Sequence, residues 1–267
     1  MTIRLTIIAL LLTTLTAGAL TPQEMVMGAA YRVRGAATVI GNAVDLDGSS
    51  EYFTTTQSNI NFGATSVTVC AWVNATSNQT AVGKIGWVCG FSPSQAEWRF
   101  MVTGGKVVLQ VYQSNLTLAQ NDVSAASAIS SNSWHFLVGV ANGSNVGVYV
   151  DGVSHGSNTA YNGTINNINA VGKIGQADQN AARYFSGLID EVAIYKNRAF
   201  TSNEVVEAYA GGVGKPLQTM STGTNGLVRL WHLDESGSQS NAYDSASGTW
   251  ATGTAISNDW VTGKVPK

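Results

Sequence analysis

The sequence predicts an all-β protein of two packed antiparallel sheets, with one short helix near residues 202–210. Three observations predict this fold class. Only 11% of the 267 residues are charged, against roughly 25% in an ordinary soluble domain, and 29 residues are Gly. Short segments with strand-like apolar patterns recur along the chain, with polar turns between them, which is typical of a sandwich. A convincing helix start signal stands in the segment that follows residue 200.

The N-terminal residues indicate an exported chain. Residues 2–16 are largely apolar with Arg4 as their one charge, and the small residues Ala17 to Ala19 follow. This is the pattern of a signal peptide, so we expect residues 1–19 to be removed by cleavage near Ala19. About 15 apolar residues are short for a membrane span, which needs roughly 20. We therefore expect a secreted protein, extracellular or at a cell surface, without a stable membrane span after cleavage.

The strand signals then follow in order. The predicted strands comprise residues 44–47, 52–54, 66–74, 98–103, 106–113, 134–140, 145–150, 189–195 and 227–233. Gly104-Gly105 and Asn142-Gly143-Ser144 supply the turns of two predicted hairpins, and Asp151-Gly152 is a third turn.

The predicted helix has clear signals at both ends. Thr201 is the expected N-cap residue and Glu204 the third helical residue, which together form a capping box. An apolar stripe with helical spacing starts at Val205, and two glycines at 211–212 end the helix. The Gly-, Thr- and Ser-rich residues 213–225 then predict a linker.

Four segments of the chain carry a family resemblance. They are GNAVDLDGSSEYF (41–53), SVTVCAWVN (66–74), SWHFLVGVANGSNVGVYVDGV (133–153) and FSGLIDEVAIYKNRAFTSNEVVEAY (185–209). In this order and spacing they resemble the laminin G-like, concanavalin A-like jelly-roll domains of bacterial surface and secreted proteins. The resemblance implies a two-sheet jelly-roll domain over residues 20–212.

The C-terminal segment, residues 226–267, departs from the family pattern. The family opens with a strand that pairs beside the Ile-Asp-Glu-Val strand, whereas here the matching sequence GLVRLWHLDESG stands near the C-terminus. The segment can complete the sandwich in its own chain, or complete a neighbouring molecule as a donor strand. It can also begin a second, truncated repeat. The sequence leaves these three arrangements open.

Composition and motifs exclude several functions. The formal net charge of −2 excludes an electrostatic nucleic-acid binder. Enzymes of the jelly-roll family that the chain resembles cleave polysaccharides with paired carboxylates. Asp190 and Glu191 are consecutive, so in a regular strand they point to opposite faces, and Asp234 and Glu235 share this defect. No serine-hydrolase elbow, zinc-protease motif or phosphate-binding loop is present. We therefore expect no enzyme activity.

The resemblance implies calcium as a cofactor. Calcium takes carboxylate and other hard oxygen ligands. The expected ligands, by resemblance, are Asp47 and Asp190, with Asp244 as a third. The alternative is structural, since Asp47 precedes a glycine in an ordinary turn and Asp190 can pair with Arg198.

Aromatic residues between the matching segments are the expected ligand-binding platform. Trp87, Trp98 and Tyr112 lie there, and the alternative for each is packing in the core. The expected partner is a glycan or a surface protein, with self-association through the C-terminal strand as a further expectation.

Cys70 and Cys89 are the two cysteines of the chain, and both lie in strand-like runs. An exported protein permits a disulfide between them, and two buried free thiols are the alternative.

The sequence thus predicts a secreted, non-enzymatic laminin G-like module for recognition or adhesion. A structural subunit of an extracellular filament or coat, joined by donor-strand exchange, is the first alternative. A divergent polysaccharide-active enzyme is the second.

Overall fold

The computed structural model describes residues 40–55, 63–76, 83–87, 97–103, 105–113, 118–121, 129–158, 161, 163–167, 172–176 and 184–266, of which 83–87, 103, 118–121 and 158 are described by backbone alone. All of them belong to one compact unit, Val39–Lys267. The predicted signal peptide, residues 1–19, lies outside the described residues.

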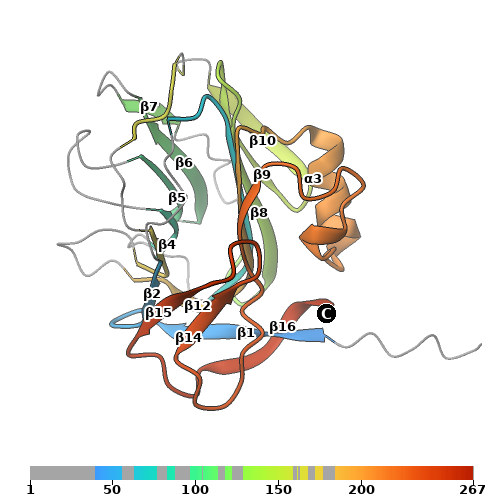
Figure 1. Cartoon of the computed structure of the whole chain (residues 1–267). Coiled ribbons are helices and arrows are strands. Elements are labelled where there is room, and N and C mark those ends of the chain that lie inside the picture. Colours follow the sequence, from blue (N-terminus) through green and yellow to red (C-terminus); the bar gives the residue numbers. More distant parts are fainter. Residues whose placement is uncertain are drawn as a thin grey trace, which may run out of the picture. The chain divides into compact units, whose positions relative to one another are not determined.

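Two layers of antiparallel strands form the unit (Figure 1). In hydrogen-bonding order, the first layer comprises β10 (Val153–Asn158), β9 (Val146–Val150), β8 (Trp134–Ala141), β3 (Val67–Ala75) and β12 (Ser186–Lys196). The second comprises β2 (Tyr52–Thr54), β11 (Gly172–Ile174), β4 (Gly83–Trp87), β5 (Trp98–Thr103), β6 (Lys106–Tyr112) and β7 (Leu118–Asn121). The predicted all-β sandwich is confirmed, and so are both hairpins, β5–β6 and β8–β9.

The main core lies between the two layers. Gly139 of β8 shows how closely they pack, because a Cβ atom there would lie 3.0 Å from the Phe100 ring and 3.1 Å from Leu109. Phe100 and Leu109 belong to β5 and β6 and are fully buried. A larger residue at position 139 would force these side chains to move, since interiors are close-packed.

The outer face of the first layer is buried as well. Cys70 and Trp72 of β3 point into a second apolar cluster, which helix α3 (Ser202–Tyr209) covers with Val205 and Ala208. The Trp72 and Tyr209 rings stack with centroids 5.9 Å apart. Because both faces of the layer are covered here, nearly every residue of β3 is buried.

The helix has the predicted capping box. The Glu204 backbone N–H donates to Thr201 Oγ1 at 3.4 Å, and the Thr201 N–H donates to Glu204 Oε2 at 2.8 Å. The predicted linker, residues 213–225, is more ordered than expected. It contains a 3-10 turn, η3 (Leu217–Thr219), and buries Leu217 and Met220 in the cluster below α3.

The C-terminal segment pairs with its own chain in this structure. Strand β13 (Leu227–Trp231) lies antiparallel to β12, and β14 (Asn241–Asp244) and β15 (Thr249–Thr254) continue the sheet as far as β2. The last strand, β16 (Trp260–Pro266), pairs with β1 (Ile40–Asp47) beside β12 (Figure 1). Among the described residues, no helix has the length and apolar character needed to cross a membrane.

A buried ion pair joins β13 to β14. Arg229 Nε lies 3.2 Å from Asp244 Oδ2, and both side chains are 1% exposed. Asp244 Oδ1 also accepts hydrogen bonds from the backbone N–H groups of Leu230, at 2.9 Å, and Ala246, at 3.0 Å. The carboxylate therefore fixes the turn after β14 and neutralises the buried guanidinium.

Replacing Asp244 by Ala should lower the free energy of unfolding by about 3–5 kcal/mol, because it leaves the Arg229 charge buried without its carboxylate. Urea unfolding measures the change. Asp45→Asn is the matched control. Asp45 is exposed at the surface, and partial burial of its carboxyl group, followed by the charge of Asp259, raises its pKa. Removing its charge should therefore not destabilise the fold. Equal unfolding midpoints for the two variants would contradict the proposed role of the ion pair.

Candidate functional site

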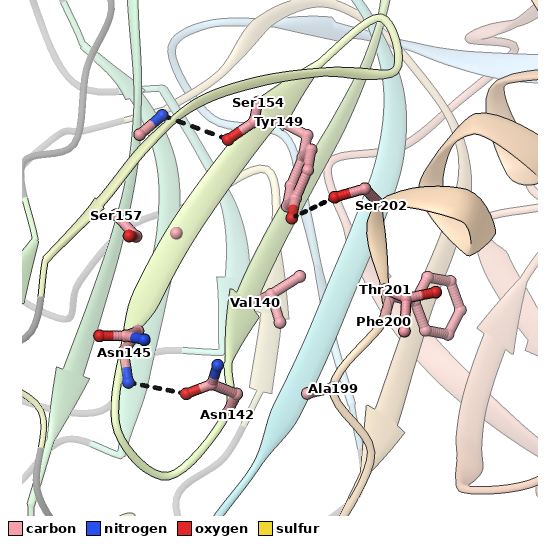
Figure 2. Close-up of a pocket in the computed structure, with 12 residues that line it drawn as sticks. Val140, Asn142, Asn145, Tyr149, Ser154, Ser157, Ala199, Phe200, Thr201 and Ser202 are labelled. Carbon is pink, nitrogen blue, oxygen red and sulfur yellow. Dashed lines mark hydrogen bonds between the residues drawn. The ribbon is translucent and has the colours of Figure 1, made fainter.

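A groove of about 380 Å3 opens on the outer side of the first layer, beside the start of α3. Three segments form its walls: the β8–β9 turn, the β9–β10 hairpin and the residues that lead into the helix (Figure 2). Its lining residues are Val140, Asn142, Asn145, Gly147, Tyr149, Ser154, Gly156, Ser157, Ala199, Phe200, Thr201 and Ser202.

Local hydrogen bonds fix the two turns that border the groove. Asn142 Oδ1 accepts the N–H groups of Ser144, at 3.0 Å, and Asn145, at 2.7 Å, which is a side-chain-closed turn. At the other end of β9, Asp151 adopts a left-handed backbone (φ 52°) and accepts the Phe136 N–H at 2.8 Å. Both turns are therefore held by their own side chains, independently of any ligand.

Tyr149 links the sheet to the helix across the groove. Its hydroxyl lies 3.3 Å from Ser202 Oγ, and Figure 2 shows the ring extending from β9 towards α3. Tyr149 is half-buried, whereas Ser202, Thr201 and Asn142 are exposed. All described lining residues are uncharged. The groove can therefore exchange hydrogen bonds with a neutral polar ligand, but its lining offers no carboxylate, imidazole or amine for acid–base chemistry.

Comparison with known families identifies the fold. The family model of laminin G-like domains, described as the concanavalin A-like lectin/glucanases superfamily, matches residues 47–206, more than half of the chain. The chain belongs to this superfamily. The predicted family and the predicted concanavalin A-like jelly roll are both confirmed. No sequence among curated proteins matches the chain.

Solved structures show the same fold at low sequence identity. A candidate carbohydrate-binding protein from Bacteroides ovatus matches with a TM-score of 0.59 and 16% identity, over 85% of this chain and 61% of that one. This concanavalin A-like chain thus spans less than two thirds of that protein.

Two weaker likenesses are a heptameric SAP-like pentraxin from Limulus polyphemus and domain 4 of an extracellular arabinanase from Geobacillus stearothermophilus in complex with arabinotriose. The pentraxin has a TM-score of 0.49 and 16% identity, over 65% of this chain and 84% of that one. The arabinanase domain has a TM-score of 0.46 and 20% identity, over 61% of this chain and 74% of that one.

Two of the three aromatic residues expected to bind a ligand are buried in this superfamily member. Trp98 is 0% exposed and packs in the main core, and Tyr112 is 5% exposed, so that expectation is corrected for both. The reason is strand alternation, because Trp98 shares the inward face of β5 with Phe100. The side chain of Trp87 lies outside the described residues. Tyr149, which does line the groove, lies in the family segment 133–153, and its residue type alone does not distinguish a ligand contact from strand packing.

The three carboxylates expected to bind calcium have separate protein partners. Asp47 Oδ1 accepts the N–H groups of Ser49, at 2.7 Å, and Ser50, at 2.9 Å. Partial burial acts to raise the pKa of Asp47, but hydrogen bonds from the Ser49 hydroxyl, from these two N–H groups and from the Ser50 hydroxyl hold it well below its usual range. Asp244 pairs with Arg229, as described above.

Asp190 lies on β12, where its Oδ2 accepts the N–H groups of Lys264, at 2.7 Å, and Val265, at 3.1 Å. Asp190 therefore holds β16 against β12. It does not form the ion pair with Arg198 that the sequence allowed, because Arg198 pairs with Glu204. In the part of the chain that the structure describes, no group of three or more His, Cys, Asp or Glu side chains is arranged to hold a metal ion. The three residues do not fit a shared calcium site, and calcium binding stays an untested prediction.

Cys70 is fully buried in the cluster below α3 and forms no disulfide with a described residue. Burial, followed by the nearby charge of Glu191, raises the pKa of its thiol. Cys89 lies outside the described residues, so the Cys70–Cys89 bridge stays a prediction.

The stability of the fold should fall as the pH rises between about 4 and 8 because of Asp190. Burial raises the pKa of this carboxyl group to about 8, above the 3.8 of the unfolded chain. Between these two pH values the unfolded chain loses the proton while the folded chain keeps it, so the free energy of unfolding falls as the pH rises. Asp190→Asn keeps an oxygen acceptor for Lys264 and Val265 but cannot ionise.

Melting temperatures of both proteins between pH 5 and pH 9 test this effect. The melting temperature of the wild type should decline relative to that of the Asn variant as the pH rises. Parallel curves would mean that Asp190 ionises in the folded state as easily as in the unfolded chain.

Proposed function

We propose that this chain is a secreted recognition module that binds a neutral glycan in the groove beside α3. The observation that carries the proposal is the uncharged, hydrogen-bonding lining of a preformed groove around a half-buried tyrosine, on a concanavalin A-like sandwich. The likeness to a candidate carbohydrate-binding protein supports the same class of ligand.

The chemistry of the lining suits a sugar ring. Sugar hydroxyls donate and accept hydrogen bonds, and the groove offers the Tyr149 hydroxyl, the Ser202 hydroxyl and the Asn145 amide for this purpose. The Tyr149 ring and Val140 add apolar surface that can pack against the C–H face of a sugar. A volume of about 380 Å3 lies within the usual range of small-molecule sites, roughly 300–1,000 Å3.

The absence of charge among the lining residues selects neutral sugars. An acidic sugar would bring a carboxylate or sulfate into a groove whose described lining contains no Lys, Arg or His. A charge removed from water without a partner costs free energy, so acidic glycans should bind more weakly. The same lining supports binding without turnover in this groove.

A protein partner and self-association remain separate proposals. In this structure β13 pairs with β12 of the same chain, so donor-strand exchange would require residues 226–266 to leave their own sandwich. The hydrogen bonds from Lys264 and Val265 to Asp190 on β12 oppose that release.

A glycan array with the purified protein should show binding to neutral oligosaccharides, equally with and without a calcium chelator. Tyr149→Ala should then weaken binding of the best glycan about tenfold or more, since it removes a ring and a hydroxyl from the groove, and tenfold corresponds to about 1.4 kcal/mol. Titration calorimetry measures the affinity.

Tyr243→Ala is the matched control, because Tyr243 is 41% exposed on β14 and does not line the groove. Its affinity should equal that of the wild type. The proposal fails if neither variant changes the affinity, if the control variant is the one that weakens binding, or if no neutral glycan on the array is bound.

A further inference from the structure

A second group of polar residues, away from the groove, forms a continuous hydrogen-bonded chain. Ser245 Oγ lies 3.1 Å from His232 Nε2, and His232 Nδ1 lies 2.6 Å from Glu191 Oε1. The three residues come from the turn after β14, the end of β13 and the middle of β12. A hydroxyl, an imidazole and a carboxylate in this order are the elements of an activated nucleophile.

Glu191 is held in a strained and buried position. The register of β12 against β3 shifts between Asp190 and Ala193, and Glu191 there has a left-handed backbone with φ of 52°. Such bulges redirect a side chain, and strain of this kind collects at functional sites. Glu191 is 4% exposed, and its contact with His232 satisfies Oε1. The bulge therefore breaks the strand alternation assumed from the sequence and aims Glu191 at the imidazole.

A second serine, histidine and carboxylate group in the same chain differs from the Ser245 group in how its histidine is bonded. Ser130 Oγ, His135 and Asp151 form a similar series, with distances of 3.0 and 2.7 Å. There, however, His135 Nε2 also accepts the Ser130 backbone N–H at 3.1 Å, so its lone pair is already engaged. The Ser245 N–H instead donates to the Leu230 carbonyl oxygen at 2.8 Å and so does not occupy His232 Nε2. The Ser245 hydroxyl has two acceptors, this carbonyl oxygen at 3.2 Å and His232 Nε2 at 3.1 Å, and rotation about the Cβ–Oγ bond directs its proton to one or the other.

Ser245 is exposed and borders a hollow of about 240 Å3. Leu227, Leu230 and Ala246 give the hollow apolar walls, and Gln218 and Thr224 add side-chain hydrogen-bond donors. The volume is below the usual range for drug-sized ligands, so the hollow fits a small acyl group. The donors are of the kind that stabilise an oxyanion during acyl transfer.

We propose that Ser245 is the nucleophile of an acyl-transfer site that accepts short-chain carboxylic esters. Ser245 Oγ attacks the ester carbonyl carbon, and its proton passes to His232 Nε2. The C–O bond to the alcohol then breaks as His232 returns this proton to the leaving oxygen. Water attacks the acyl-serine with His232 as the base, which releases the carboxylic acid and restores Ser245. Glu191 is a positioning residue that orients the imidazole.

The reaction requires unprotonated His232, so its rate should rise with pH. Burial acts to lower the pKa of His232, but the hydrogen bond and charge of Glu191, with Asp234 and Asp190, raise it above its ordinary value. The charge of Glu235 also interacts with that of the imidazole. Glu191→Gln removes the strongest of these charges and should move the pH profile to lower pH, a change that a purely structural role would not cause.

The test uses the full chain with p-nitrophenyl acetate, p-nitrophenyl decanoate and a fluorophosphonate. The acetate should be hydrolysed faster than the decanoate, and peptide mass spectrometry should place the phosphonate label on Ser245. Ser245→Ala should abolish labelling and lower acetate hydrolysis by about 100-fold or more, the scale of general-base assistance. Ser130→Ala, the matched control, should keep the wild-type rate.

Thermal unfolding checks that Ser245→Ala folds, and little change is expected because the side chain is exposed. The proposal is overturned if a folded Ser245→Ala protein hydrolyses the acetate at the wild-type rate, or if the label is absent or lies on another residue. These outcomes leave the glycan groove unaffected, since no residue is shared between the two sites.

Discussion

The rest of the structure depends on one edge of β12, because this edge pairs with two different strands. Residues Ser186–Ile189 pair with β1, and Val192–Tyr195 pair with β13. The change of partner falls at Asp190 and Glu191, where regular pairing with β3 on the opposite edge is also interrupted. The two acids occupy the point at which a continuous ladder is impossible.

Each acid forms side-chain hydrogen bonds at the point where the backbone pairing is interrupted. The Asp190 carboxyl group accepts the N–H groups of two residues of β16, and the Glu191 carboxyl group contacts the histidine that follows β13. Buried polar groups are tolerated when such partners satisfy them. Side-chain hydrogen bonds therefore continue the connection between the strands across the break.

Local signals in the sequence were sufficient for much of the fold. The capping box at Thr201 and the two hairpins depend on neighbouring residues, and the structure has all of them. The strand predicted at 227–233 is present but shorter, at Leu227–Trp231. Long-range features were less accessible. A regular strand predicts alternating faces at Asp190-Glu191, and no local sequence signal indicates the bulge at which β12 changes its partner from β1 to β13.

The candidate sites show the same division. Trp98 resembled a ligand platform because aromatic residues suit sugars, but its direction is decided by the layer that packs against β5. The groove around Tyr149 joins a hairpin to a helix start some 50 residues later. The Ser245 group combines a residue of β12 with residues that follow β13 and β14. Such sites exist only after folding, so residue type and spacing could not reveal them.

The pairing of β1 with β16 has a consequence for architecture. Ile40 lies opposite Pro266, so the chain enters and leaves the compact unit at one place (Figure 1). A domain with adjoining ends can be inserted into a loop of a host protein without stretching either connection. With its two ends side by side, the unit can connect to neighbouring segments from one place on its surface.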